Sequence, residues 1–219
     1  RTGNYRKADL VYKGKAFEGD AGESGDKTIA EIAIRTRGNT TRVIPENPKS
    51  SGKFYRSHFA IKFNKTFSLS EGSPEYEKRK DRRFCNLRGI NLKFQNIWNR
   101  DEDPSMFREL YSYDLMNRMG INAPKTGIAK LYFKIKESDG STTTKYYGIY
   151  TMIEPIDKSF LTRRFGKDQN DGNLYKCLWQ QNDASTLEST SGKLGVEKWE
   201  TNYRPSMDLT TNEDSPNFD

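Results

Sequence analysis

A lysine and a glutamate stand at positions where they could act together. Lys62 lies on the polar face of an alternating strand, His58–Asn64, and Glu109 interrupts the apolar stretch Pro104–Met119, which we predict to be a helix. A buried carboxylate needs a cationic or hydrogen-bonding partner. In protein kinases, a strand lysine held by a helix glutamate binds nucleotide phosphates. Lys62 and Glu109 are therefore our candidate catalytic residues.

Two alternatives to this pair stay open. Lys93 occupies an equivalent face of the strand Ile90–Phe94, so it competes with Lys62 for the same role. The second alternative has no functional content: Glu109 could form an ordinary surface salt bridge, with Lys62 simply solvated.

A candidate phosphate-binding turn follows the strand Ile29–Arg37. Gly38 permits a tight turn after Arg37, and Asn39 continues it. Exposed backbone amides together with arginines can hold phosphate oxygens. The same pattern is also common at ordinary hairpin tips, so the segment predicts phosphate binding only in combination with other features.

Flat and flexible apolar side chains lie near the exit of the strand Lys145–Ile153. Tyr146 and Met152 could line an adenine slot there, before the chain leaves through Pro155. The competing interpretation is that both side chains belong to the hydrophobic core.

Composition limits the class of protein and its partners. The 219 residues carry 37 Lys+Arg against 30 Asp+Glu, a net charge of +7, which permits an anionic partner without naming one. The basic run 78–83 has aromatic residues only at its edges, Tyr76 and Phe84, so we expect no nucleic-acid partner. No stretch approaches the ~20 apolar residues of a membrane helix, so we expect no membrane span.

Cysteine and histidine are too scarce for the common metal sites. The chain has one histidine and two cysteines, which argues against a His-based or cysteine-cluster metal centre, and we predict no metal ligands. If the protein is exported, Cys85 and Cys177 could be bridged; two separate thiols are the alternative.

The elements predict an α+β fold: a mixed, mainly antiparallel sheet with one long helix, Pro104–Met119, packed on more than one side. A short helix is predicted at Asp157–Phe165, ended by Gly166. Strands are predicted at 8–17, 29–37, 58–64, 90–94, 128–136, 145–153 and 173–180.

Several of these motifs, taken in order, resemble the spore coat protein H (CotH) kinase family over roughly residues 29–180. The motifs are IRTRGNTT (34–41), FAIKF (59–63), DPSMFREL and MNRMGINAPKT (103–126), YYGIYTMIEPIDKSFLTRRFG (146–166) and DGNLYK (171–176). The resemblance implies an atypical protein kinase that transfers the γ-phosphate of ATP to protein hydroxyls. It also implies a bacterial spore-coat, secreted or cell-surface location.

The resemblance gives the candidate residues roles in the ATP-facing lobe of such a kinase. Lys62 would contact phosphate and Glu109 would hold that lysine; Arg37, Gly38 and Asn39 would form the phosphate-side turn, and Tyr146 and Met152 would contact adenine near a hinge at Glu154–Asp157. It implies a single domain over 1–219 that is the N-terminal lobe of a larger kinase, with 182–219 as a loop-rich approach to a second lobe.

The aspartates that hold Mg²⁺ in the family are expected outside this chain, so the chain alone is expected to be inactive. The alternative function is a non-catalytic surface-binding or adhesion module that keeps the lobe without its chemistry. A protein substrate is the partner expected for a kinase.

Overall fold

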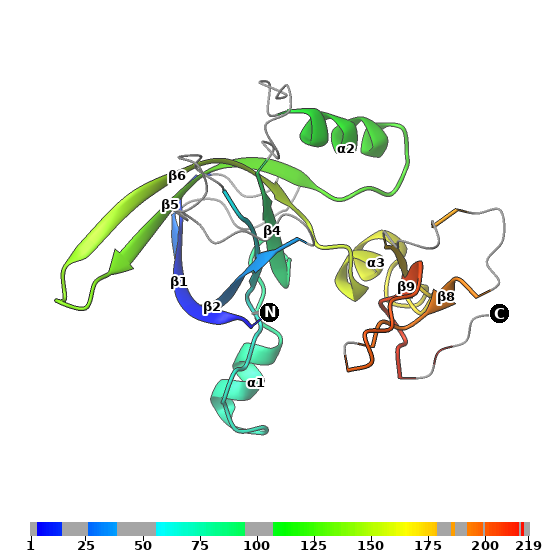
Figure 1. The fold of residues 1–219 in the computed structure, drawn as a ribbon, viewed down its shortest axis with the longest axis horizontal. Coiled ribbons are helices and arrows are strands. Elements are labelled where there is room, and N and C mark those ends of the chain that lie inside the picture. Colours follow the sequence, from blue (N-terminus) through cyan, green and yellow to red (C-terminus); the bar gives the residue numbers. More distant parts are fainter. Residues whose placement is uncertain are drawn as a thin grey trace. The chain divides into compact units, whose positions relative to one another are not determined.

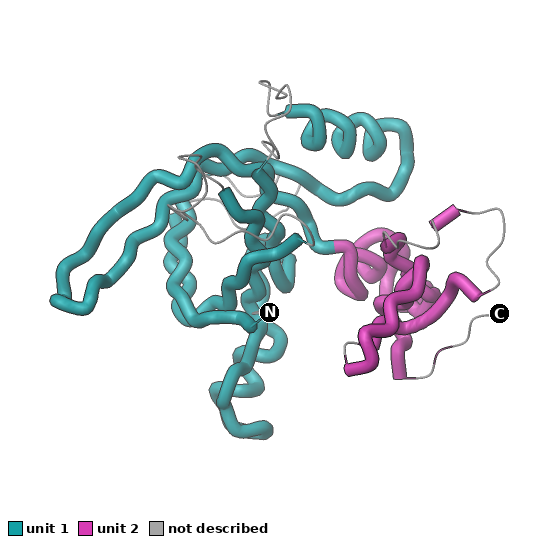
Figure 2. The backbone as a smooth tube through the Cα atoms, in the orientation of Figure 1, with its two compact units in different colours: residues 1–155 teal, residues 156–219 magenta. Residues whose placement is uncertain are grey.

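The computed structural model describes residues 4–14, 26–38, 56–94, 107–178, 185–186, 192–198, 200–214 and 216. Within it the chain divides into two compact units, residues 1–155 and 156–219, which are coloured separately in Figure 2. Each unit is described by itself.

The first unit is built on a six-stranded antiparallel sheet with the strand order β1-β2-β3-β4-β6-β5 (Figure 1). Its strands are β1 (Arg6–Tyr12), β2 (Lys27–Arg37), β3 (His58–Lys62), β4 (Gly89–Lys93), β5 (Thr126–Lys136) and β6 (Thr142–Ile153). Two short helices interrupt them: α1 (Pro74–Lys80) and α2 (Arg108–Arg118). The predicted α+β class with a mainly antiparallel sheet is confirmed.

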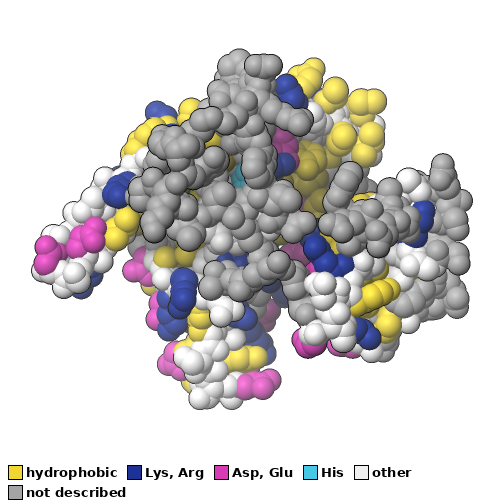
Figure 3. Space-filling view, viewed as in Figure 1, with side chains coloured by type: hydrophobic (Ala, Val, Ile, Leu, Met, Phe, Trp, Pro, Cys, Tyr) yellow, Lys and Arg dark blue, Asp and Glu magenta, His cyan; other side chains and the backbone are white. Residues whose placement is uncertain are grey.

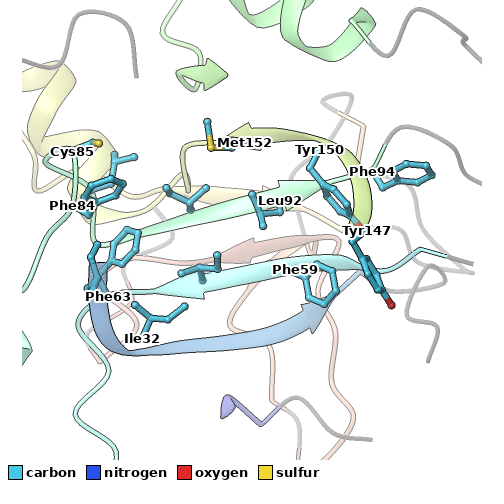
Figure 4. Close-up of a cluster of buried hydrophobic side chains, with 14 residues drawn as sticks. Ile32, Phe59, Phe63, Phe84, Cys85, Leu92, Phe94, Tyr147, Tyr150 and Met152 are labelled. Carbon is cyan, nitrogen blue, oxygen red and sulfur yellow. The ribbon is translucent and has the colours of Figure 1, made fainter. Parts of the chain in front are cut away.

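Alternation along the central strands separates a core face from a polar face. Phe59 pairs with Leu92 and Ile61 with Ile90, and all four side chains are buried in one hydrophobic cluster (Figure 4). Since successive side chains of a strand point to opposite faces, Lys62 and the residues next to each core position leave the sheet on the other side. That second face carries the polar residues discussed below.

The mixed apolar period of β2 has a structural cause. Glu31 adopts a left-handed backbone conformation, with φ 51°, and the β1–β2 register shifts between Ala8 and Leu10. The extra residue lets both Ile29 and Ile32, three positions apart, reach the buried side. The irregularity is fixed by the Asp9 carboxylate, which accepts a hydrogen bond from the Glu31 backbone N–H at 2.8 Å.

Helix α1 was missed by the sequence analysis, which treated its basic residues as part of a charged run. Ser73 caps it by accepting a hydrogen bond from Tyr76 N–H. Two arginines of the run then tie the segment to the sheet: Arg79 pairs with the Glu31 carboxylate at 2.6 Å, and Arg82 donates to three backbone carbonyls. The basic run therefore anchors the β2 bulge.

Helix α2 is shorter and far more exposed than predicted. It spans 11 residues, and none of its side chains is buried. Tyr111 is 64% exposed and the adjoining Met119 68% exposed, so apolar side chains gather on the surface over α2 (Figure 3). The predicted packing on more than one side is wrong for the described part of the helix, because a wide apolar stripe does not reveal how many elements lie against it. Residues 104–106 lie outside the described ranges.

The second unit contains α3 (Lys158–Phe165) and a small sheet of β7 (Tyr175–Cys177), β8 (Leu194–Gly195) and β9 (Met207–Leu209), in the order β7-β9-β8. Asp157 caps α3 by accepting from two backbone N–H groups, and Gly166, with φ 81°, ends it as predicted. None of the described helices is long and apolar enough to cross a membrane.

Neither cysteine forms a disulfide bond. Cys85 is buried in a tight turn of the first unit, and Cys177 is exposed on β7. The bridge that export would favour is therefore not formed in this structure.

Arg82→Met should lower the free energy of unfolding by about 2 kcal/mol, because three backbone carbonyls lose the hydrogen bonds that the charged Arg82 side chain donates to them. Lys78→Met, at an exposed position of the preceding helix α1, should change stability by less than about 0.5 kcal/mol. Urea unfolding of both variants measures the difference. Equal stabilities would show that α1 does not anchor the bulge.

Candidate phosphate-binding site

The structure pairs Glu109 with Lys93. Lys93 Nζ lies 2.8 Å from Glu109 Oε1, and the side chains are 36% and 17% exposed. Lys93 is the last residue of β4, on the polar face of the sheet, and Glu109 stands in the first turn of α2. The contact therefore joins a strand end to a helix start across 16 residues of chain.

Lys62 lies on the same face but not at the same place. It pairs in register with Gly89, at the start of β4, whereas Lys93 ends that strand four residues later. At ~3.4 Å per residue, this separates the two lysines along the sheet by more than 10 Å. Among the described residues Lys62 forms no ion pair with Glu109; its ammonium lies 6.0 Å from the centre of the Tyr5 ring. The sequence left Lys62 and Lys93 as alternatives, and in the structure Lys93 is the lysine that forms an ion pair with Glu109.

Two arginines of β2 join the same face. Arg37 pairs in register with His58, and Arg35 with Ala60, so both arginines alternate onto the polar side of the sheet. Burial lowers the pKa of Arg37, the positive charge of Arg35 lowers it further, and the Glu109 carboxylate opposes both. Arg37 is therefore close enough to interact electrostatically with both Glu109 and Arg35. The Arg37–Gly38 end of the predicted phosphate turn lies beside the Lys93–Glu109 pair.

His58 is buried beneath these cations and is held neutral. Its Nδ1 accepts a hydrogen bond from the Phe94 backbone N–H at 3.0 Å. Burial, followed by the charges of Lys93 and Arg37, lowers the pKa of His58 to about 4. The imidazole adds no positive charge near pH 7, and it ties the start of β3 to the residue that follows Lys93.

Tyr113 lies next to the Glu109 carboxylate, one turn further along α2. Burial raises the pKa of the Tyr113 hydroxyl, and the negative charge of Glu109 raises it again. The hydroxyl stays protonated near pH 7, which leaves Glu109 as the carboxylate opposite Lys93 and Arg37.

This arrangement is suited to an anion with several charges. Among the described residues of this face, the single negative charge of Glu109 offsets only part of the positive charge of Arg35, Arg37 and Lys93. The face therefore keeps excess positive charge in a partly dehydrated place. Arginine and lysine are the usual ligands of phosphate oxygens. The same residues do not fit a divalent cation, and no cluster of three or more His, Cys, Asp or Glu side chains that could hold a metal occurs in the described ranges.

The structure places the two predicted adenine contacts in different surroundings. Met152 pairs in register with Leu92, which precedes Lys93, so its side chain enters the hydrophobic core and is only 7% exposed. Tyr146 is 50% exposed and packs its ring 4.9 Å from that of Tyr132 on the β5–β6 hairpin. Asn39, the last residue of the predicted phosphate turn, lies outside the described residues.

Sequence reasoning missed His58 and Tyr113 as members of the site. The alternation of HFAIKFN does place His58 on the polar face with Lys62, which was the available signal. Tyr113 follows Glu109 by four positions, the spacing that stacks side chains on one helix face, so it could have been found in the same way.

Comparison with known proteins supplies the family. Residues 34–215 match the model of the CotH kinase protein family. This chain belongs to the CotH kinase family. The match covers most of both units, from the end of β2 onward, and confirms the resemblance recognised in the motifs. Comparisons with curated proteins and with solved structures gave no match. A kinase family implies the use of ATP and of an acceptor substrate.

His58 should make stability depend on pH in a defined window. Its folded pKa, about 4, is below the unfolded value of 6.5, so the unfolded chain takes up the proton first as the pH falls. The contribution of neutral His58 to the free energy of unfolding is fully present above the unfolded pKa and is lost as the pH falls toward the folded pKa. This loss should amount to about 2 kcal/mol between pH 7 and pH 5. Urea unfolding at both values, for wild type and His58→Gln, measures this contribution.

The variant should lack that share of the pH dependence whatever its absolute stability. Identical slopes in the two proteins would mean that His58 is not buried in neutral form.

Proposed function

We propose that this CotH-family chain carries the phosphate-binding machinery of an atypical protein kinase, which transfers the γ-phosphoryl group of ATP to protein hydroxyls. The observation that carries the proposal is the 2.8 Å contact between Lys93 and Glu109. In protein kinases a strand lysine binds the nucleotide phosphates, and a glutamate of a following helix holds that lysine in place.

The order of elements supports this assignment. The strand with the lysine, β4, is followed along the chain by the helix with the glutamate, α2, and then by the hairpin β5–β6. After β6 the chain is fixed at Glu154, whose backbone N–H donates to Lys125 O and whose carboxylate accepts from Lys125 N–H. A firmly held exit suits the hinge role that the family resemblance implies for 154–157.

Electrostatics supports a nucleotide as the ligand. Within the described part of the site, His58 is neutral and Glu109 is the one carboxylate beside these cations. The excess charge on Arg35, Arg37 and Lys93 is therefore available to a polyphosphate. Such cations stabilise the charge that spreads over the transferred group in phosphoryl transfer.

The roles divide among the chain's own residues as follows. ATP, the phosphoryl donor, supplies a high-energy phosphoanhydride. Lys93 would bind its phosphate oxygens, Glu109 would keep the Lys93 ammonium at that position, and Arg37 with Gly38 would border the phosphates. The proposal assigns no metal ligand within the described residues, and the nature of the adenine contacts remains a prediction. A spore-coat or cell-surface location also remains a prediction.

Substituting the two lysines separately tests the choice between them. Lys93→Met should weaken ATP binding by about tenfold or more and abolish most transfer, because it removes a charged phosphate ligand. Lys62→Met should have a clearly smaller effect, since Lys62 lies away from Glu109. Calorimetric titration with Mg²⁺-ATP gives the affinity, and ³²P incorporation into a serine-rich acceptor protein by the full-length kinase gives the transfer.

The reverse pattern would return the phosphate-binding role to Lys62. If Lys93→Met keeps both the ATP affinity and the phosphoryl transfer of wild type, the proposal is overturned. ATP binding by wild type in a full-length protein that transfers no phosphate to any acceptor would favour the alternative of a non-catalytic binding module.

Glu109→Gln tests the orienting role separately from binding. The amide keeps the shape of the side chain but loses its charge, so Lys93 remains present without its ionic partner. The turnover number should fall by about tenfold or more while the KM for ATP changes less, as expected for a residue that acts through another. An effect of equal size on KM and none on turnover would indicate that Glu109 merely tunes the charge of the site.

A further inference from the structure

We propose that Arg35 and Arg37 form a clamp for a phosphate dianion, distinct from the Lys93–Glu109 pair and adjacent to it. This inference deepens the proposed function, because it assigns a second phosphate subsite on the same face of the sheet. The preferred occupant is the terminal phosphate of a nucleoside triphosphate.

The first observation is an unsatisfied buried donor. Arg35 Nε is buried and has no hydrogen-bond partner. In the described part of the chain the Arg35 guanidinium contacts the face of the Tyr5 ring, 5.0 Å from its centre, and forms no ion pair. Burying a charged donor without an acceptor is costly, and such groups in native proteins call for a ligand or another cause.

The second observation is a pair of like charges held close together. Arg35 lowers the pKa of Arg37, which is itself largely withdrawn from solvent. Within the described residues Arg37 also lacks a hydrogen-bonded carboxylate of its own; Glu109 acts on it through charge while bonding directly to Lys93. Two neighbouring arginines without acceptors repel each other, and an anion between them would remove both costs.

Geometry favours phosphate as that anion. The arginines are two residues apart on β2 and leave the same face, with the small side chain of Ala60 on the neighbouring strand opposite Arg35. Side chains at this spacing lie roughly 7 Å apart along a strand, so two guanidinium groups can converge on one tetrahedral group. Each guanidinium can donate two parallel hydrogen bonds to phosphate oxygens.

Tyr5 restricts how Arg35 can move. The Tyr5 ring lies against the Arg35 guanidinium and, at 6.0 Å, near the Lys62 ammonium. A planar group stacked on an aromatic ring keeps its edge donors free while its faces are covered. Arg35 is thereby pre-oriented for a ligand without being neutralised by one.

The test compares anion binding by wild type and Arg35→Gln, with calorimetric titrations of ATP, ADP, pyrophosphate and a phosphoserine peptide. Arg6→Gln is the matched control. Arg6 is exposed and pairs in register with Ile34, so it leaves the sheet on the face opposite to Arg35. Arg35→Lys, which keeps the charge but not the planar fork, separates charge from geometry, and circular dichroism confirms that each variant folds.

If the clamp takes the terminal phosphate, wild type should bind ATP more tightly than ADP. Arg35→Gln should then lose about tenfold in ATP affinity, and Arg35→Lys less, with ADP binding little changed. Arg6→Gln should bind both nucleotides as wild type does. Loss of pyrophosphate and phosphoserine-peptide binding with ATP unaffected would place a phosphate from the protein substrate in the same clamp.

Unchanged binding of all these ligands in Arg35→Gln would overturn the clamp. If Lys93→Met still weakens ATP binding in that case, the proposed function is unaffected. Conversely, Arg35-dependent pyrophosphate binding in a protein that fails to bind ATP would support the clamp and contradict the kinase assignment.

Discussion

The described residues on the polar face of the sheet carry more positive than negative charge. Arg35, Arg37 and Lys93 come from strands β2 and β4, and Glu109 of α2 is the carboxylate that meets them. Burial of His58 keeps a further charge from being added. Charges in such a half-dehydrated place interact more strongly than in water, so the site is arranged for an anionic ligand before one arrives.

Because the sheet has a core face and a polar face, the core can stabilise the strands that carry these cations. Leu92 and Met152 pair across β4 and β6 and lie in the core, while Lys93, one residue further along, faces the other way. The hydrophobic cluster therefore stabilises the same strands whose opposite side bears the repelling cations. The bulge at Glu31 and its bonds to Arg79 fix the strand that carries the two arginines.

Local sequence patterns were enough to predict the faces of the strands but not their neighbours. Alternation placed Lys62 and Lys93 correctly on a polar face, yet it contains no information about which strand end lies beside α2. The register of β3 against β4 decides between the lysines, and register depends on contacts far apart in the chain. Met152 lies in the core, one of the two interpretations that the sequence left open for it, because its register against Leu92 depends on contacts far apart in the chain.

A double-mutant cycle on Lys93 and Glu109 tests most directly whether the pair acts as one unit in nucleotide binding. ATP affinity is measured for wild type, Lys93→Met, Glu109→Gln and the double variant. If Glu109 acts through the lysine, adding Glu109→Gln to Lys93→Met should cost little further affinity, giving a coupling free energy of about 1 kcal/mol or more. Fully additive losses would contradict the assignment, because they would show that the two residues contribute to nucleotide binding independently.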